Sequence, residues 1–148
     1  KDVQIRLPTE QEWMLAARLK NNSSSFFPWG EGYVRNSNGS FLCNYRTIPE
    51  IFLKKDSTGN SMYEIPEFEN PIIGADLDGY SCIAPVASFW KNEYGLFDMS
   101  GNIAEMIKDQ NFTKGGSWWS ELDYVTINAR ENHVKSSPTV GFRLVMIK

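Results

Sequence analysis

The start of a single helix constrains this chain most, because only there are all the signals of a helix boundary present together. Thr9 and, three residues later, Glu12 form a capping box, and Pro8 stands directly before it. We therefore expect a helix from Thr9 to about Leu19. Its apolar face, at helical spacing, consists of Trp13, Ala16 and Ala17.

The rest of the sequence is typical of loops and short strands. Between Tyr33 and Tyr80, turn-forming residues interrupt short apolar pieces that show neither helical nor strand periodicity. The polar segment from Lys54 to Glu69 predicts a surface loop. We expect an α+β fold low in regular secondary structure. A strand or helical turn is predicted at Ile103 to Ile107, and strands at Ser117 to Trp119, Tyr124 to Ile127 and Phe142 to Ile147.

Length and charge exclude several classes of protein. The 148 residues suffice for one domain, residues 1–148. The chain has 15 basic and 18 acidic residues and a net charge of −3, so it lacks the positive surface needed to bind nucleic acid. Its apolar residues are too interrupted for a membrane-spanning helix, so we do not expect the chain itself to cross a membrane.

Few residues suggest catalysis. His133 is the only histidine, and the sequence has no nucleophile-elbow, zinc-protease or phosphate-loop motif. Cys43 and Cys82 are compatible with a nucleophile, a copper pair, a disulfide or buried thiols. Asp78-Gly79 and the acidic turn from Asp98 to Glu105 have the oxygen-rich composition of cation sites, although local turns explain such residues equally well.

Four segments in this order resemble the formylglycine-generating enzyme domain, the sulfatase-modifying-factor family. They are Arg6-Leu7-Pro8-Thr9-Glu10 with Glu12-Trp13, then Phe27-Pro28-Trp29-Gly30, then Tyr94-Gly95-Leu96-Phe97-Asp98-Met99-Ser100-Gly101-Asn102, and lastly Lys114-Gly115-Gly116-Ser117-Trp118 with Gly141-Phe142-Arg143-Leu144. The resemblance implies a compact C-type-lectin-like fold. It also implies that this chain is a C-terminal part of the domain, because the family has further strands upstream of the first segment.

The resemblance places the catalytic cysteines at Ser120 and Val125. Active members of the family bind monovalent copper between two cysteines and use it, with oxygen, to oxidise a cysteine of a target sulfatase. Neither Ser120 nor Val125 has a thiol, so no copper is expected. Ser117 and Tyr124, which neighbour this site in active members, are retained, and we interpret them as a turn hydroxyl and a packed aromatic ring.

The resemblance also implies one or two calcium ions. Oxygen atoms are available at every matching position. One site matches Asn44, Tyr45, Asp78 and Tyr80, and the other matches Asp98, Gly101, Ile103 and Glu105. If the first site forms, Cys43 and Cys82 come close together, which makes a disulfide between them a specific hypothesis.

Part of the pattern, from Tyr33 to Asn44 and from Gly101 to Glu105, resembles the branch of the family found in gliding-motility and type IX secretion lipoproteins. We therefore expect a non-catalytic scaffold in a cell-envelope assembly, exported to the periplasm or outer membrane, with other protein subunits as partners and a lipid anchor supplied by an upstream segment. The alternatives are a lectin-like module that binds carbohydrate or another ligand, and an oxidoreductase with an unrecognised site.

Overall fold

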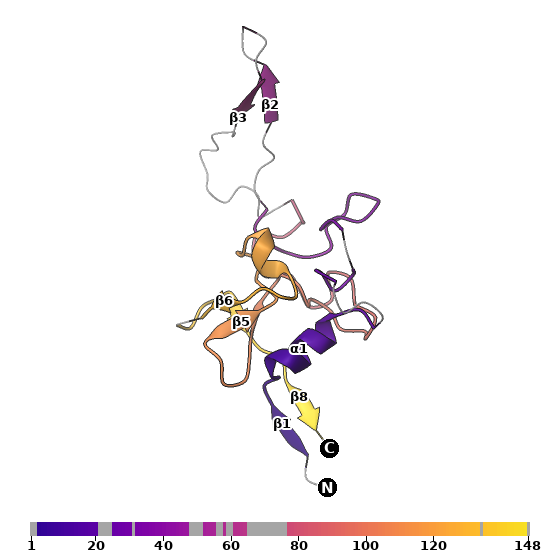
Figure 1. The fold of residues 1–148 in the computed structure, drawn as a ribbon, viewed down its shortest axis with the longest axis vertical. Helices are drawn as coiled ribbons and strands as arrows, with labels where there is room; N and C mark the ends of the chain where they lie inside the picture. Colours follow the sequence, from indigo (N-terminus) through magenta and orange to yellow (C-terminus); the bar gives the residue numbers. More distant parts are fainter. Residues whose placement is uncertain are drawn as a thin grey trace.

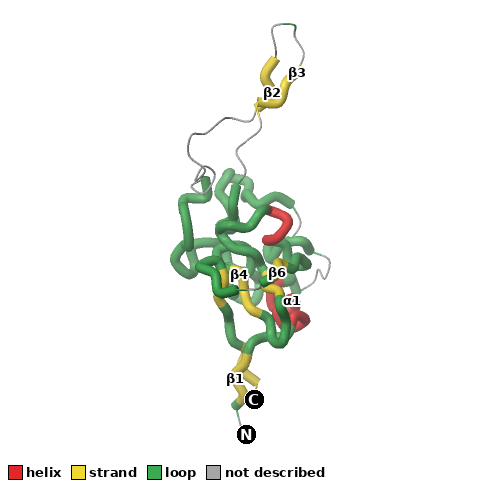
Figure 2. Tube along the Cα trace, turned by 90° about the vertical axis from the view of Figure 1, so that its left-hand side faces the viewer, coloured by secondary structure: helices red, strands yellow, loops and turns green. Residues whose placement is uncertain are grey.

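Three small sheets and two helical segments make up the regular structure of this computed structural model. It describes residues 3–20, 25–30, 32–47, 52–55, 58, 61–64, 77–133 and 135–147. The elements are β1 (Gln4–Arg6), α1 (Glu10–Ala17), β2 (Phe52–Lys55), β3 (Ser61–Glu64), β4 (Ala104–Met106), β5 (Phe112–Lys114), the 3₁₀ helix η1 (Leu122–Val125), β6 (Glu131–Asn132), β7 (Val140–Gly141) and β8 (Val145–Ile147). Loops connect them over most of the described chain (Figure 2), which confirms the predicted α+β class.

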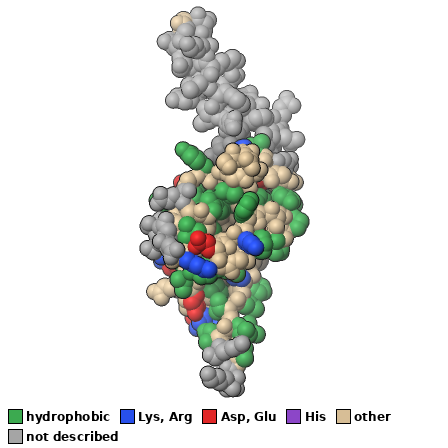
Figure 3. Space-filling view, turned by 90° about the vertical axis from the view of Figure 1, so that its right-hand side faces the viewer, with side chains coloured by type: hydrophobic (Ala, Val, Ile, Leu, Met, Phe, Trp, Pro, Cys, Tyr) green, Lys and Arg blue, Asp and Glu red, His purple; other side chains and the backbone are tan. Residues whose placement is uncertain are grey.

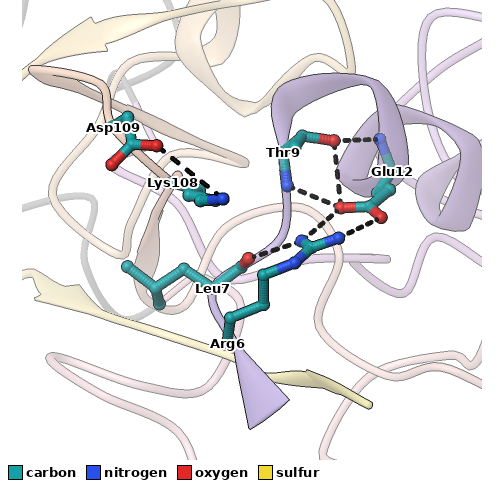
Figure 4. A network of polar contacts seen from close by, with 6 residues as sticks. All are labelled: Arg6, Leu7, Thr9, Glu12, Lys108 and Asp109. Atoms are coloured by element: carbon teal, nitrogen blue, oxygen red, sulfur yellow. Dashed lines mark hydrogen bonds and ion pairs between the residues drawn. The ribbon is translucent and has the colours of Figure 1, made fainter. Parts of the chain in front are cut away.

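The predicted capping box forms at the start of α1. The backbone N–H of Glu12 donates to Thr9 Oγ1 at 3.3 Å, and the backbone N–H of Thr9 donates to Glu12 Oε2 at 2.8 Å. The guanidinium of Arg6, at the end of β1, donates to both carboxylate oxygens of Glu12 at 2.7 and 2.8 Å (Figure 4). The helix start is thereby bonded to the strand that precedes it.

Two apolar clusters form the core. Helix α1 contributes Trp13 and Ala17 to the first cluster, as its predicted apolar face requires. The other buried members of this cluster are Met99, Ile107 and Ile127. The second cluster is built from loops and η1, and its buried members are Phe27, Cys43, Tyr45 and Val125.

The largest sheet has the strand order β6-β5-β4-β7, with β4 antiparallel to β5 and parallel to β7. Glu105, in the middle of β4, lies opposite Lys114 on one side and Gly141 on the other. Strands β1 and β8 form a separate antiparallel ribbon in which Ile5 lies opposite Met146. Figure 1 shows this ribbon projecting from the body, with both chain ends at its tip.

Several predicted boundaries were wrong. The helix ends at Ala17 rather than near Leu19, because Arg18 adopts an extended conformation with ψ 160°. Ser117 to Trp119 forms a turn, not a strand, since Gly115 and Gly116 before it have positive φ values of 84° and 65° and reverse the chain.

Two further segments also differ from the prediction. The segment Tyr124 to Ile127 begins inside η1 instead of forming a strand. Within the predicted loop from Lys54 to Glu69, Ser61–Glu64 pairs with Phe52–Lys55 as a hairpin, and residues 65–69 lie outside the described part of the chain.

The acid sensitivity of the Arg6–Glu12 contact is testable with Glu12→Gln. The hydrogen bonds from Arg6 and then from Thr9 lower the pKa of Glu12 from 4.5 to about 2. A lowered pKa means that the carboxylate contributes its full stabilisation above pH 4.5 and loses it as the pH falls towards 2. In urea denaturation, we expect wild type to be more stable than the variant at neutral pH and the difference to shrink over that acidic range. A difference that stays constant would contradict this interpretation.

Candidate functional site

The buried carboxylate of Glu105 connects the parts of the chain that surround the candidate site. It accepts hydrogen bonds from Trp13 Nε1 at 2.6 Å and from Arg143 Nε and Nη2 at 2.6 and 2.5 Å. The same guanidinium donates to the carbonyls of Phe97 and Asp98 at 3.2 and 3.4 Å. Helix α1, strand β4 and the segment before β8 are therefore all fixed to the turn that begins at Asp98.

The Gly101-Asn102 turn brings three distant loops together. Gly101 has φ 68°, and a Cβ there would lie 2.1 Å from the carbonyl oxygen of Asn44, so glycine is required. The backbone N–H of Asn102 donates to Asn44 O at 2.8 Å, and its own carbonyl accepts from the backbone N–H of Trp118 at 3.0 Å. Its side-chain amide bonds to both the N–H and the carbonyl of Ala84, at 2.8 and 3.2 Å. This turn therefore adjoins both predicted calcium sites and the loop after Gly-Gly-Ser.

At the second predicted calcium site, one oxygen is available and one carboxylate is already bonded. Asp98 Oδ2 accepts from the backbone N–H of Ala87 at 3.1 Å, whereas Oδ1 is buried without a hydrogen-bond partner in the described part of the protein. Burial raises the pKa of Asp98 above its ordinary value. Glu105 is bonded to Trp13 and Arg143, and the carbonyl of Gly101 accepts from the N–H of Ile103 at 2.9 Å.

The residues predicted for the first calcium site lie on two loops that a hydrogen bond joins. Asn44 Nδ2 donates to the carbonyl of Cys82 at 2.8 Å. Asp78 Oδ1 accepts from the backbone N–H of Tyr80 at 3.0 Å. Burial, and secondly the charge of Asp78, raise the pKa of the Cys43 thiol. Asn44 and Tyr45 lie on one of these loops, and Asp78 and Tyr80 lie on the other.

The disulfide predicted between Cys43 and Cys82 is absent from the structure, in which both thiols are free. Cys43 is completely buried in the apolar cluster that contains Val125, whereas Cys82 is exposed. The two side chains therefore occupy different environments. The hydrogen bond from the Asn44 amide to the Cys82 carbonyl joins the two segments instead.

Ser120, which the family resemblance places at the position of one catalytic cysteine, closes a tight turn. Its Oγ accepts from the backbone N–H of Ser117 at 2.9 Å, lies 3.0 Å from Ser117 Oγ and donates to Glu131 Oε2 at 2.8 Å. Ser117 Oγ also accepts from the backbone N–H of Trp119 at 3.2 Å, which confirms its interpretation as a turn hydroxyl. Four contacts between the two serines, Glu131 and the backbone therefore hold this loop in place.

Val125, which the resemblance places at the position of the other catalytic cysteine, is a core residue. Its side chain is fully buried, and a Cβ added to Gly116 would lie 2.7 Å from Val125 Cγ1. Tyr124 was predicted to be packed, yet it is 41% exposed. Successive side chains of the 3₁₀ helix η1 point about 120° apart, and Val125 is the one that is buried.

Sequence reasoning missed the roles of two basic residues. Lys114, in β5, is fully buried, with its Nζ 3.4 Å from Glu10 Oε1 and 5.7 Å from the centre of the Trp13 ring. Burial lowers the pKa of Lys114, while Arg130 also pairs with Glu10 at 2.6 Å. Arg143 holds Glu105, as described above. The sequence did contain a signal for both roles. Lys114 and Arg143 are each the single basic residue of a glycine-containing motif, Lys114-Gly115-Gly116 and Gly141-Phe142-Arg143.

An open cavity of about 490 Å³ adjoins the Glu105–Arg143 pair. Its walls include Ile83, Val86, Phe142 and Asp98. Among the described residues, no group of three or more His, Cys, Asp or Glu side chains could hold a metal ion, so a cation here would depend on backbone carbonyls. The described helices are also too short to cross a membrane.

Comparison with known proteins identifies the family. Residues 2–148 match the family described as "Sulfatase-modifying factor enzyme 1-like domain". The chain belongs to this family. It is 31% identical over 115 residues to the formylglycine-generating enzyme of Thermomonospora curvata, an alignment that covers 78% of this chain and 28% of that protein. It is also 28% identical over 156 residues to the inactive C-alpha-formylglycine-generating enzyme 2 of Bos taurus, covering 93% of this chain and 42% of that protein.

Solved structures agree on the fold. Treponema denticola variable protein 1 matches with a TM-score of 0.60 and 21% identity over 95% of this chain and 46% of that one. PvdO from Pseudomonas aeruginosa matches with a TM-score of 0.60 and 18% identity over 95% of this chain and 51% of that one. The chain thus spans about half the length of these solved relatives, and less than half of the two curated ones above.

Glu105→Gln tests whether the Glu105–Arg143 pair holds the site together. Removing the charge leaves the partly buried guanidinium without its partner, so we expect the free energy of unfolding to fall by about 2–4 kcal/mol. The matched control is Glu121→Gln, which breaks the exposed Arg46–Glu121 pair and should cost less than about 1 kcal/mol. Chemical denaturation of the two variants measures both values, and equal losses would refute the structural role of Glu105.

Proposed function

We propose that this chain is a non-catalytic, calcium-stabilised binding domain of the formylglycine-generating-enzyme type. The observation that supports the proposal best is the state of the two former cysteine positions. The Ser120 hydroxyl is used in turn-closing hydrogen bonds, and the Val125 side chain is buried among apolar groups. A family relative named as inactive is compatible with a protein that has kept the scaffold and lost the chemistry.

Copper does not fit the residues present. A site for monovalent copper needs soft ligands such as thiolates, and a serine hydroxyl and a valine offer none. The chain has two cysteines, of which Cys43 is buried with a raised thiol pKa and Cys82 is exposed. A buried thiol that resists deprotonation is a poor replacement for the missing ligands.

Calcium fits the turn from Asp98 to Glu105 in part. Asp98 Oδ1 is a buried carboxylate oxygen without a hydrogen-bond partner among the described residues, and a hard cation would offset the cost of burying it. Asp98 and the carbonyls of Gly101 and Ile103 would hold the ion. The carboxylate of Glu105 is shared with Trp13 and Arg143, so its contribution would be weaker. A second ion would be held by Asn44, Tyr45, Asp78 and Tyr80.

The loops are the reason calcium matters to this fold. Irregular backbone loses conformational entropy on folding without gaining the hydrogen-bond ladders of a helix or sheet. A bound ion that links distant loops offsets part of that loss. The rigid loop surface that results, of the C-type-lectin-like kind, suits recognition of other proteins.

The setting we propose is the cell envelope. The partial likeness to gliding-motility and type IX secretion lipoproteins supports an exported protein, in the periplasm or at the outer membrane, whose partners are other subunits of an envelope assembly. A lipid anchor would come from a segment outside these residues.

Asp98→Asn tests the calcium proposal. With calcium in large excess, we expect the wild-type melting temperature to exceed that in chelator by about 5–10 °C for each bound ion, since a ligand at 100 times its Kd adds about 2.7 kcal/mol. The variant should lose the part of this difference that the ion at Asp98 contributes while melting near wild type in chelator, because asparagine can still accept the Ala87 hydrogen bond.

Asp109→Asn is the matched control. Asp109 also has a positive φ, 56° against 54° for Asp98, but its side chain is 83% exposed. This variant should keep the wild-type response to calcium. An unresponsive wild type, or an Asp98 variant that keeps the full wild-type response, would contradict the proposal.

A further inference from the structure

A second open cavity, of about 640 Å³, has walls that are largely aromatic. The aromatic side chains that line it are Phe41, Tyr80, Phe89 and Trp90, and they define the aromatic cavity. Phe89 is buried at its base, whereas Trp90 is 67% exposed. The body presents apolar side chains elsewhere too, as the face in Figure 3 shows. A cavity of this size with aromatic walls and a few polar groups is typical of a binding site.

The rings of the aromatic cavity are held in place by contacts within the chain. Tyr80 and Phe89 pack edge to face, with their ring centres 5.8 Å apart. Phe41 packs edge to face on the buried Tyr45, at 6.1 Å between ring centres, and forms a β-bridge with Arg35. Side chains that are already fixed lose little conformational entropy when a ligand arrives. The cavity is therefore organised before it is filled.

The polar groups of the aromatic cavity mainly accept hydrogen bonds. The Tyr80 hydroxyl donates to Ser88 Oγ at 3.1 Å, and Ser88 Oγ donates to the carbonyl of Pro85 at 2.7 Å. Both hydroxyls therefore offer a ligand only their lone pairs. Asp78 is the only charged side chain among the described residues that line the cavity, and its negative charge favours a cation nearby. A suitable ligand donates hydrogen bonds and carries positive charge.

The ring faces favour the same kind of ligand, because the face of an aromatic ring attracts a cation. The guanidinium of Arg35 lies 3.9 Å from the centre of the Phe41 ring, and that of Arg46 lies 5.6 Å from the centre of the Trp119 ring. Among the described residues, no cation–ring contact involves Trp90. This exposed ring can therefore receive a cation from another molecule.

We propose that the aromatic cavity binds an arginine side chain of a partner protein. A guanidinium has five N–H donors and no acceptor, stacks flat on aromatic rings and is more weakly hydrated than an ammonium, so it meets each requirement above. The charge of Asp78 disfavours anionic ligands. This inference rests on the proposed function, because it names a chemical feature of the protein partners proposed there.

The inference involves only one of the two proposed calcium sites. Asp98 does not line the aromatic cavity, so an ion held there is compatible with a bound arginine. Asp78 is a proposed ligand of the other ion, and a calcium ion and a guanidinium at this carboxylate would repel each other. Binding of arginine is therefore best measured in chelator, where no calcium competes for Asp78.

An NMR titration of the complete gene product in chelator tests the inference. The probe is N-acetyl-arginine amide, whose capped ends imitate a residue within a polypeptide. The signal of the Trp90 indole N–H, recognised by its absence from Trp90→Phe, reports on the cavity. We expect this signal to shift until it saturates. N-acetyl-citrulline amide, which has the same length without the charge, is the control ligand and should bind about tenfold more weakly.

A pair of variants tests the role of the cavity's charge. Asp78→Asn should weaken binding of the arginine compound several-fold, because the charge is lost while the asparagine oxygen can still accept from the backbone N–H of Tyr80. Asp109→Asn removes a carboxylate that is 83% exposed and lies outside the cavity, so it is the matched control and should leave the affinity unchanged.

Three results would overturn the inference directly: an unshifted Trp90 signal, equal binding of the citrulline compound, or equal affinities of the two variants. A Trp90 shift with N-acetylglucosamine but not with the arginine compound would overturn it in favour of a carbohydrate site. Tighter binding of free arginine than of the capped compound would overturn it in favour of a small-molecule site. None of these outcomes would alter the predicted calcium response of the melting temperature, so failure of the proposed function remains distinguishable.

Discussion

The bidentate contact between Glu105 and Arg143, extended to the indole of Trp13, is the interaction on which the rest of this structure depends. The regular elements of the described structure are two to eight residues long and contribute few ladder hydrogen bonds. The hydrogen bonds of this charged network supply additional stabilisation, because they fix helix α1, strand β4 and the segment before β8 in one arrangement. Replacing it would require repacking three parts of the chain at once.

The network also explains why the loops are ordered. Arg143 reaches past Glu105 to the carbonyls of Phe97 and Asp98, where the Gly101-Asn102 turn begins. That turn touches the backbone of Asn44, Ala84 and Trp118, so the order imposed at the core reaches each loop of the candidate site. Asp98 is the exception within this arrangement, since burial raises its pKa and one of its oxygens lacks a hydrogen-bond partner in the described structure.

Features that depend on residues close together in the sequence were predicted, whereas features that depend on contacts between residues far apart in the sequence were missed. The capping box of Thr9 and Glu12 formed because its partners are three residues apart. The strand predicted at Ser117 to Trp119 is a turn, since Gly115 and Gly116 reverse the chain and the Ser117–Ser120 contacts close it. Burial of Lys114 depends on Glu10, 104 residues away, and no periodicity encodes that pairing. The family segments indicated candidate site residues, but they did not show that Cys43 is buried while Cys82 is exposed.

The central claim is that the family scaffold has been kept while its copper chemistry has been replaced by calcium-dependent rigidity. Elemental analysis of the purified complete protein, combined with an assay for conversion of a cysteine-containing sulfatase peptide, tests this claim most directly. The account predicts one or two bound calcium ions per chain, no bound copper and no conversion of the peptide. Stoichiometric copper together with turnover of the peptide would contradict it.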